Sequence, residues 1–221
     1  MIPKTLHQIW LGDEPLPSRE SEWQQEWIDR HPDWEYKLWT DQEISAHGWD
    51  KTFEVERADS WSCKSDIYRF AILMQYGGVY LDTDMECIGS LDTLNLEKDF
   101  ICAPQTDETP PSPKAIICGA FLACKPMSHA IRLMYHTVPY RQMTFGHANA
   151  SGKFGPWYVT DILYRKYKLS KSEWFTDDIE YLPRMSFFAG FRKKGEEKTN
   201  EIQQAKRSSV GIGLHHWNKS W

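Results

Sequence analysis

The sequence predicts an α/β fold formed by a single domain with a mostly parallel sheet. Segments with the apolar pattern of strands alternate along the chain with segments whose apolar residues recur every three or four positions, as they do in helices. The length of 221 residues is that of one domain of moderate size. We therefore treat residues 1–221 as one folded unit with one core.

The first elements are two strands separated by a helix. Thr5–Leu11 is an apolar-rich run, and Trp34–Trp39 alternates apolar with charged residues at a period of two, so both segments are expected to be strands. Between them, a helix is expected to start near Ser18 and to stop before Pro32.

A second helix is expected to lead directly into a third strand. Apolar residues recur at helical spacing over Ala58–Tyr76, and Gly77 and Gly78 end the pattern as a helix terminus does. Val79–Met85 then predicts a strand. The later elements that the pattern predicts are strands at Phe100–Ala103, Ile116–Ala123 and Gly211–His216 and helices at His129–Thr137 and Pro156–Tyr167.

Composition and charge exclude several classes of partner. The net charge is −5, and the basic run Arg192–Lys194 is followed at once by acidic residues, so we expect a solvated loop there and no nucleic-acid partner. The N-terminus lacks the features of a secretory signal, and the five cysteines form no C-x-x-C pair. These features predict a cytoplasmic protein, with peripheral contact at the inner face of a membrane left open.

Chemistry is expected first at the end of the third strand. Asp82 and Asp84 lie two residues apart, so both side chains should project to one face of Val79–Met85 at its carboxyl end, where ligands bind in α/β sheets. Adjacent carboxylates repel each other, and a divalent cation with oxygen ligands is the simplest compensation. The plainer interpretation of Asp82–Asp84 is an acidic surface turn after an edge strand.

The preceding helix adds a second polar feature. Asp66 and Arg69 are three residues apart, on one face of the predicted helix. Such a pair is commonly an exposed ion pair of little energetic consequence. Here the helix leads through Gly77 and Gly78 to the two aspartates, so the pair can lie beside the same pocket and bind hydroxyl or phosphate groups.

The block Lys64–Met85 closely resembles the DXD-motif sugar transferases, the family of fungal initiating mannosyltransferases and bacterial capsular-polysaccharide transferases. It is more distantly similar to the catalytic domains of clostridial glucosylating toxins. The resemblance extends to Ile2–Gly12, Pro32–Trp39 and His215–Trp221. It implies a GT-A fold, with a Rossmann-like domain that binds a nucleotide-sugar, and a C-terminal segment, 211–221, that binds metal and pyrophosphate.

The resemblance also implies roles for individual residues. The catalytic set is Asp66, Arg69, Asp82 and Asp84. The donor-binding set is Gln8, Trp10, Asp66, Arg69, Tyr80, Asp82, Thr83, Lys219 and Trp221. The metal shell is drawn from Asp82, Asp84, His215 and His216. Of the two histidines, His215 is the first choice and His216 the second, and the sequence alone does not separate them. Consecutive residues of a strand project to opposite sides, so at least one of the two is expected to be structural. The acceptor side is expected at Gly155, Pro156 and Trp157.

The implied activity is that of a metal-dependent retaining hexosyltransferase in polysaccharide or glycoconjugate synthesis. Its cofactor would be Mn²⁺ or Mg²⁺, its donor a UDP-sugar or, less favoured, a GDP-sugar, and its acceptor a glycan or a lipid-linked saccharide. Two alternatives stay open: a metal-dependent phosphohydrolase, and a glycan-binding module that uses some of the 11 tryptophans as stacking platforms. One departure from the family lies at Ile117–Ala120, where many relatives carry an asparagine.

Overall fold

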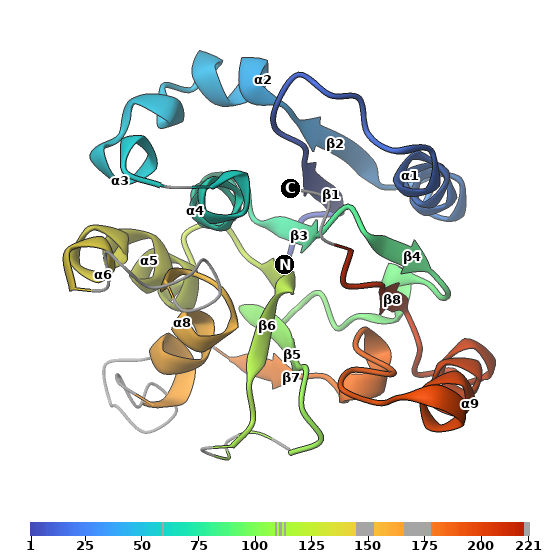
Figure 1. Cartoon of the computed structure of the whole chain (residues 1–221). Helices are drawn as coiled ribbons and strands as arrows, with labels where there is room; N and C mark the ends of the chain where they lie inside the picture. The colour runs from blue at the N-terminus through green and yellow to red at the C-terminus, as the bar shows by residue number, and fades with distance from the viewer. Residues whose placement is uncertain are drawn as a thin grey trace.

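The computed structural model describes residues 1–58, 60–108, 110, 112, 114–144, 153–165 and 178–218. Its centre is one six-stranded sheet (Figure 1). The strands, in the order in which they lie side by side, are β2 (Glu35–Trp39), β1 (Thr5–Ile9), β3 (Gly78–Leu81), β6 (Ile117–Cys124), β5 (Phe100–Pro104) and β7 (Ile179–Tyr181). The β2–β1, β1–β3 and β5–β7 pairs are parallel, whereas β6 is antiparallel to both of its neighbours. The predicted α/β class with a mostly parallel sheet is confirmed.

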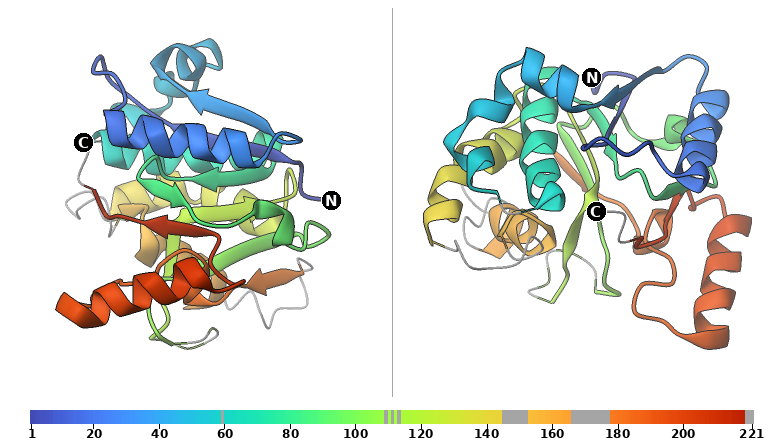
Figure 2. Two further views of the ribbon diagram at one scale, coloured as in Figure 1. Left: turned by 90° about the vertical axis from the view of Figure 1, so that its right-hand side faces the viewer. Right: turned by 45° about the horizontal axis from the view of Figure 1, so that its top comes forward.

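A short antiparallel ribbon joins two distant parts of the chain. It consists of β4 (Met85–Cys87), which directly follows the third strand, and β8 (Gly213–His215), near the end of the chain. Figure 2 shows this ribbon between the first helix and the last one. The sequence predicted the last strand, and the pairing with β4 brings residues 85 and 215 into register.

Helices cover both faces of the sheet (Figure 1). One face carries α4 (Trp61–Tyr76), α5 (His129–His136), α6 (Val138–Thr144) and α8 (Pro156–Thr160). The other face carries α1 (Ser18–Arg30), the β4–β8 ribbon and α9 (Gly195–Arg207). Two short helices, α2 (Asp41–Ala46) and α3 (Phe53–Glu56), follow β2. Within the described ranges, no helix combines the length and apolar character needed to cross a bilayer.

The core is divided by the sheet into two layers. Alternate residues of β3 point to opposite sides: Tyr80 belongs to the cluster under α4 and α5, and Val79 and Leu81 belong to the cluster under α1. Trp27 of α1 anchors the second cluster, and its indole Nε1 donates a hydrogen bond of 2.7 Å to the carbonyl of Met85. Burial of these apolar side chains supplies most of the favourable free energy of folding.

The strand predicted over Val79–Met85 is shorter in the structure. It ends at Leu81, residues 82–84 form a turn, and Met85 starts β4 in the second sheet. Two carboxylates on a central strand would be buried between core layers without compensation, whereas a turn places them at the sheet edge. The helix predicted over 156–167 is described only as far as residue 165, and its last turn has π-helical geometry.

Candidate active site

The site begins at the turn after β3, which two elements hold in place. The amide of Asp82 donates to the carbonyl of Ala120 on β6 at 3.0 Å. From β1, the side chain of Gln8 donates to the carbonyl of Asp82 at 3.1 Å and accepts from the Tyr36 hydroxyl at 2.7 Å. Gln8 was expected to contact the donor, and in the structure its amide positions the backbone of this turn.

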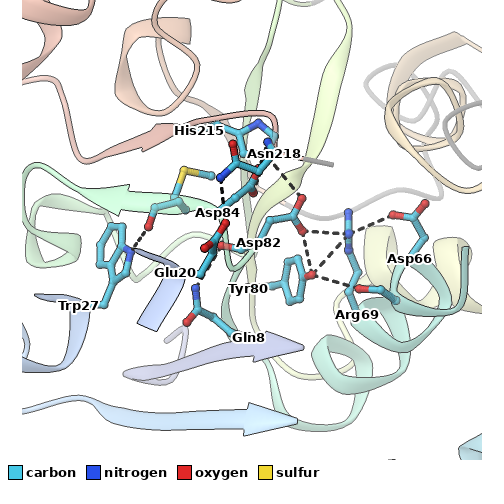
Figure 3. A network of polar contacts seen from close by, with 12 residues as sticks. Gln8, Glu20, Trp27, Asp66, Arg69, Tyr80, Asp82, Asp84, His215 and Asn218 are labelled. Carbon is cyan, nitrogen blue, oxygen red and sulfur yellow. Dashed lines mark hydrogen bonds and ion pairs between the residues drawn. The ribbon is translucent and has the colours of Figure 1, made fainter. Parts of the chain in front are cut away.

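A buried polar network lies beside the turn, between α4 and β3 (Figure 3). The Arg69 guanidinium, through Nη2, contacts Asp66 Oδ1 at 3.0 Å and Asp82 Oδ1 at 3.1 Å. The Tyr80 hydroxyl donates to the same Asp82 oxygen at 2.8 Å. Asp66 and Arg69 are 6% and 5% exposed, so this helical pair is buried and is not a surface ion pair.

Burial and charge act against each other in this network. Burial raises the pKa of Asp66 to about 7, although Arg69 acts in the opposite direction. Burial also raises the pKa of Tyr80, so its hydroxyl keeps its proton. For Arg69, burial by itself would lower the pKa, but Tyr80, Asp82 and Asp66 outweigh it and raise the pKa. The network thus presents a charged guanidinium beside a carboxyl group whose pKa burial raises.

Three side chains converge where the turn meets the β4–β8 ribbon. Nε2 of His215 lies 3.0 Å from Asp84 Oδ1 and 3.7 Å from Asp82 Oδ2. Within the described ranges, these three residues form the group whose ligand atoms, all within 4.8 Å of one another, could hold a metal ion. Two carboxylates and one imidazole form a donor set that suits Mn²⁺ or Mg²⁺ with positions left for phosphate oxygens.

The second histidine points elsewhere. His216 Nε2 lies 2.8 Å from Glu86 Oε2, and its ring stacks on Trp23 of α1 at 4.3 Å between centroids. Glu86 also pairs with Lys206 of α9. The hydrogen bond from His216, together with Lys206, lowers the pKa of Glu86 to about 2. The geometry thus brings His215, and not His216, to both aspartates.

One further carboxylate, which the sequence did not single out, braces this region. Glu20 of α1 is buried, and it accepts a hydrogen bond of 2.8 Å from the Asn218 side chain. The backbone amide of Asn218 in turn donates to Asp84 Oδ2 at 2.7 Å (Figure 3). The sequence contained a signal for this role. Glu20 lies three residues before Trp23 and seven before Trp27, on the same buried helix face, and a carboxylate on such a face is normally paired with a partner.

A cavity of about 210 Å³ opens between these groups and α8. Its lining combines the polar network with small and apolar residues: Ser62, Ser65, Asp66, Arg69, Asp82, Cys118, Gly119, Ala120, Gly155, Pro156, His215 and Trp217. Gly119 lies in the segment that departs from the family pattern. A Cβ atom at this position would lie 2.3 Å from Nη1 of Arg69, so any larger residue would displace the guanidinium from its present place.

The other predicted residues have different placements. Trp10 is 8% exposed, and its indole Nε1 donates to the carbonyl of Glu14 at 2.7 Å. Thr83 is buried within the turn. On the expected acceptor side, Gly155 and Pro156 line the cavity, and Trp157 is 44% exposed. Lys219 and Trp221 lie outside the described residues, as does the end of the predicted segment 211–221.

The fold is that of GT-A glycosyltransferase domains. Residues 17–101, a range that contains Asp82 and Asp84, match the family described as "Glycosyltransferase sugar-binding region containing DXD motif". The resemblance of Lys64–Met85 to the DXD-motif glycosyltransferases is thus confirmed by the family match over residues 17–101.

Among curated proteins, two yeast relatives illustrate the similarity. Inositol phosphoceramide mannosyltransferase 3 of Schizosaccharomyces pombe is 39% identical over 97 residues, which are 42% of this chain and 27% of that protein. Mannosyl phosphorylinositol ceramide synthase SUR1 of Saccharomyces cerevisiae is 38% identical over 105 residues, which are 42% of this chain and 25% of that protein. The match thus spans about a quarter of the length of these relatives.

Solved structures agree on the fold. The PaToxG glycosyltransferase superposes with a TM-score of 0.59 at 16% identity, over 96% of this chain and 79% of that chain. The UDP-bound glycosyltransferase domain of the YGT toxin gives a TM-score of 0.55 at 9% identity, over 81% of this chain and 79% of that chain. At these identities the likeness establishes a shared architecture.

Proposed function

We propose that this protein is a metal-dependent retaining glycosyltransferase. It moves a hexose or an N-acetylhexosamine from a nucleotide-sugar, with a UDP-sugar favoured, to a glycan or lipid-linked acceptor. The observation that carries the proposal is the convergence of Asp82, Asp84 and His215 beside a cavity that Asp66 and Arg69 also line. A cation-binding group and a hydroxyl-binding group thus face one space.

Charge supports a cation at this site. Even with a proton on Asp66, the carboxylates of Asp82 and Asp84 outnumber the single guanidinium of Arg69, so these groups leave an excess of negative charge. A nucleoside diphosphate adds further negative charge. A divalent cation between them would stabilise the leaving diphosphate as the bond to the sugar breaks.

The residues of the chain would then bind and orient the donor. Asp84 and His215 hold the cation, and Asp82 shares in this while it is fixed by Arg69 and Tyr80. Asp66 and Arg69 have polar atoms on the cavity wall that can bind the hydroxyl groups of a sugar. Retention would follow from attack by the acceptor on the face that the diphosphate leaves, with the diphosphate taking the proton of the acceptor.

The names of the relatives suggest candidates for donor sugar and acceptor. The yeast proteins are named for mannose and for inositol phosphoceramide, a lipid, so mannose joins the sugars to be tested and a lipid-linked acceptor is favoured. The UDP-bound toxin domain supports a uridine nucleotide. A lipid-linked acceptor would bring the protein to the cytoplasmic face of a membrane as a peripheral protein, which we propose as its location.

The test is thermal unfolding in the presence of UDP, GDP and their common sugar conjugates, each with Mn²⁺ and with a chelator. A ligand that binds only the native state raises the melting temperature. We expect one nucleotide to do so only with Mn²⁺, and Asp84→Asn to abolish the shift. Asp33→Asn, at an exposed aspartate outside the site, is the matched control and should keep it. A shift with free glycans and none with any nucleotide would contradict the proposal and favour a glycan-binding module.

A further inference from the structure

A second cavity, of about 200 Å³, lies at the carboxyl ends of β5 and β7. Strands β3, β5 and β7 run in the same direction, because β6 is antiparallel to both β3 and β5, and β7 is parallel to β5. The three strands therefore end at one edge of the sheet, the edge where ligands bind in α/β folds. The second cavity thus lies on the same edge as Asp82, which directly follows β3.

The two cavities are close enough to bind parts of one molecule. In the sheet order β3–β6–β5–β7, neighbouring strands lie about 4.8 Å apart, so the ends of β5 and β7 are roughly 10–15 Å from the end of β3. Phe188 contacts a lining residue of each cavity. Its carbonyl accepts a hydrogen bond of 2.7 Å from Nη1 of Arg184, which lines the second cavity. Its ring meets that of His215, which lines the first, at 5.9 Å between centroids.

The lining of the second cavity combines apolar faces with groups that bind hydroxyls. Its apolar part consists of Pro104, Pro110, Tyr181, Leu182 and Pro183. Its acidic part consists of Asp107 and Glu108, whose carboxylates accept hydrogen bonds. A sugar ring has an apolar C–H face and a rim of hydroxyl groups, so it can contact both parts at once.

Charge distinguishes a sugar from the other parts of a lipid-linked acceptor. Asp107 pairs with Arg184 at 2.9 Å and with Lys193 at 3.5 Å. Arg184 also pairs with Glu201, and Lys193 with Glu197. Because each cation is shared between two carboxylates, this surrounding disfavours a phosphate group. It also disfavours an acyl chain, whose binding would remove water from the charged groups.

We propose that the second cavity binds a sugar unit of the acceptor that lies a few units away from the reacting sugar. This inference rests on the proposed function. The reacting hydroxyl would lie beside Asp82, and the rest of the glycan would follow the sheet edge past Phe188 to the ends of β5 and β7. A single sugar or a bare lipid headgroup is too short to occupy both cavities. The acceptor is therefore an oligosaccharide, free or linked to a lipid.

The experiment measures how affinity depends on the length of the glycan. Calorimetric titrations use mono-, di-, tri- and tetrasaccharides of mannose, glucose and galactose, with Mn²⁺ and either UDP or GDP present. We expect the Kd to fall about tenfold from the monosaccharide to the longest glycan of the series that binds. Glu108→Ala should raise the Kd of that longest glycan about three- to tenfold, the effect of one lost hydrogen bond to a charged group. It should leave the Kd of the monosaccharide and of the nucleotide unchanged.

Glu97→Ala is the matched control, because it removes an exposed carboxylate just before the amino end of β5, at the opposite edge of the sheet. If Glu108→Ala lowers the melting temperature, Glu108→Gln replaces it, since glutamine keeps the size of the side chain and removes the charge. An affinity that does not depend on length, no binding of any glycan, or an equal loss for short and long glycans would overturn the second site. Nucleotide binding with Mn²⁺ would then still support the proposed function. A wild-type protein that binds no nucleotide would overturn the proposed function, and this inference with it.

Discussion

His7 on β1 and His215 on β8 are both buried, at 1% and 7% exposure, yet their surroundings differ in kind. His7 has a protein partner at each ring nitrogen: Nδ1 accepts from the Trp39 indole at 3.1 Å, and Nε2 meets the Gly77 carbonyl at 3.0 Å. Burial lowers the pKa of His7 to about 4, so its ring is neutral. His215 has carboxylates at Nε2 and no partner among the described residues at Nδ1.

Burial alone therefore does not mark a functional histidine in this fold. Both ring nitrogens of His7 are hydrogen-bonded to neighbouring elements, so the ring has no donor or acceptor left for a ligand. This is the pattern of a structural residue. His215 faces two negative charges and a cavity, which is the pattern of a ligand-binding residue. Four experiments test this distinction.

The first experiment concerns metal binding. His215→Ala should weaken the binding of Mn²⁺ more than about tenfold, because a donor is lost from a set of three. Free Mn²⁺ measured by electron paramagnetic resonance during a titration checks this. His216→Ala is the matched control and should shift the affinity less, since that ring bonds Glu86. Equal losses in both variants would refute the assignment of His215.

The second effect is on folding at the other histidine. His7→Ala should lower the free energy of unfolding by about 3 kcal/mol, because it leaves the Trp39 N–H and the Gly77 carbonyl buried without partners. Urea denaturation gives this value. The affinity for Mn²⁺ should stay near that of the wild type, and its collapse in a folded variant would contradict a purely structural role.

The third effect is a pH dependence that His7 imposes on stability. The pKa of His7 is lowered in the folded state, from 6.5 to about 4, so its contribution is fully present above pH 6.5 and is lost as the pH falls toward 4. The loss should amount to about 3 kcal/mol over that window. The difference in unfolding free energy between wild type and His7→Gln, measured from pH 7 to pH 4, isolates this contribution. A difference that does not change with pH would show that His7 keeps its ordinary pKa.

The smallest effect concerns the brace beside His215. Glu20→Gln weakens the hydrogen bond from the Asn218 side chain, and through Asn218 the contact with Asp84. We expect Mn²⁺ to bind about threefold more weakly, the effect of a weakened hydrogen bond to a charged group. Glu22→Gln, on the same helix, is the control. Identical titration curves for the two variants would show that α1 does not influence the metal site.

The sequence predicted the elements whose pattern reflects burial. Strands β1, β2, β5 and β6 and helices α1, α4 and α5 lie within a few residues of their expected positions. Helix α9 was missed because its buried side is very small: Ala205 is buried, and Ile202 packs beside it. The sequence nevertheless contained a helix signal at the two ends of this segment. Glu196 lies in the first turn and Lys206 in the last, the charge distribution that the helix dipole favours.

The pairing of β4 with β8 could not be predicted from local pattern. Strands of three residues carry little periodicity, and the two segments are far apart along the chain. The turn at residues 82–84 was missed for a related reason, because an apolar run does not show where the chain leaves one sheet for another. The pairing nevertheless determines where His215 lies.

The chemical groups of the site were determined by the sequence itself. Asp82 and Asp84 are close in space because they are close in the chain, and Asp66 and Arg69 share a helix face through the helical repeat. The packing of the fold determines which histidine joins them, and it brings Glu20 against the C-terminal segment. These contacts join residues more than a hundred positions apart in the chain. They form only because α1 and β8 pack against the turn that carries Asp82 and Asp84.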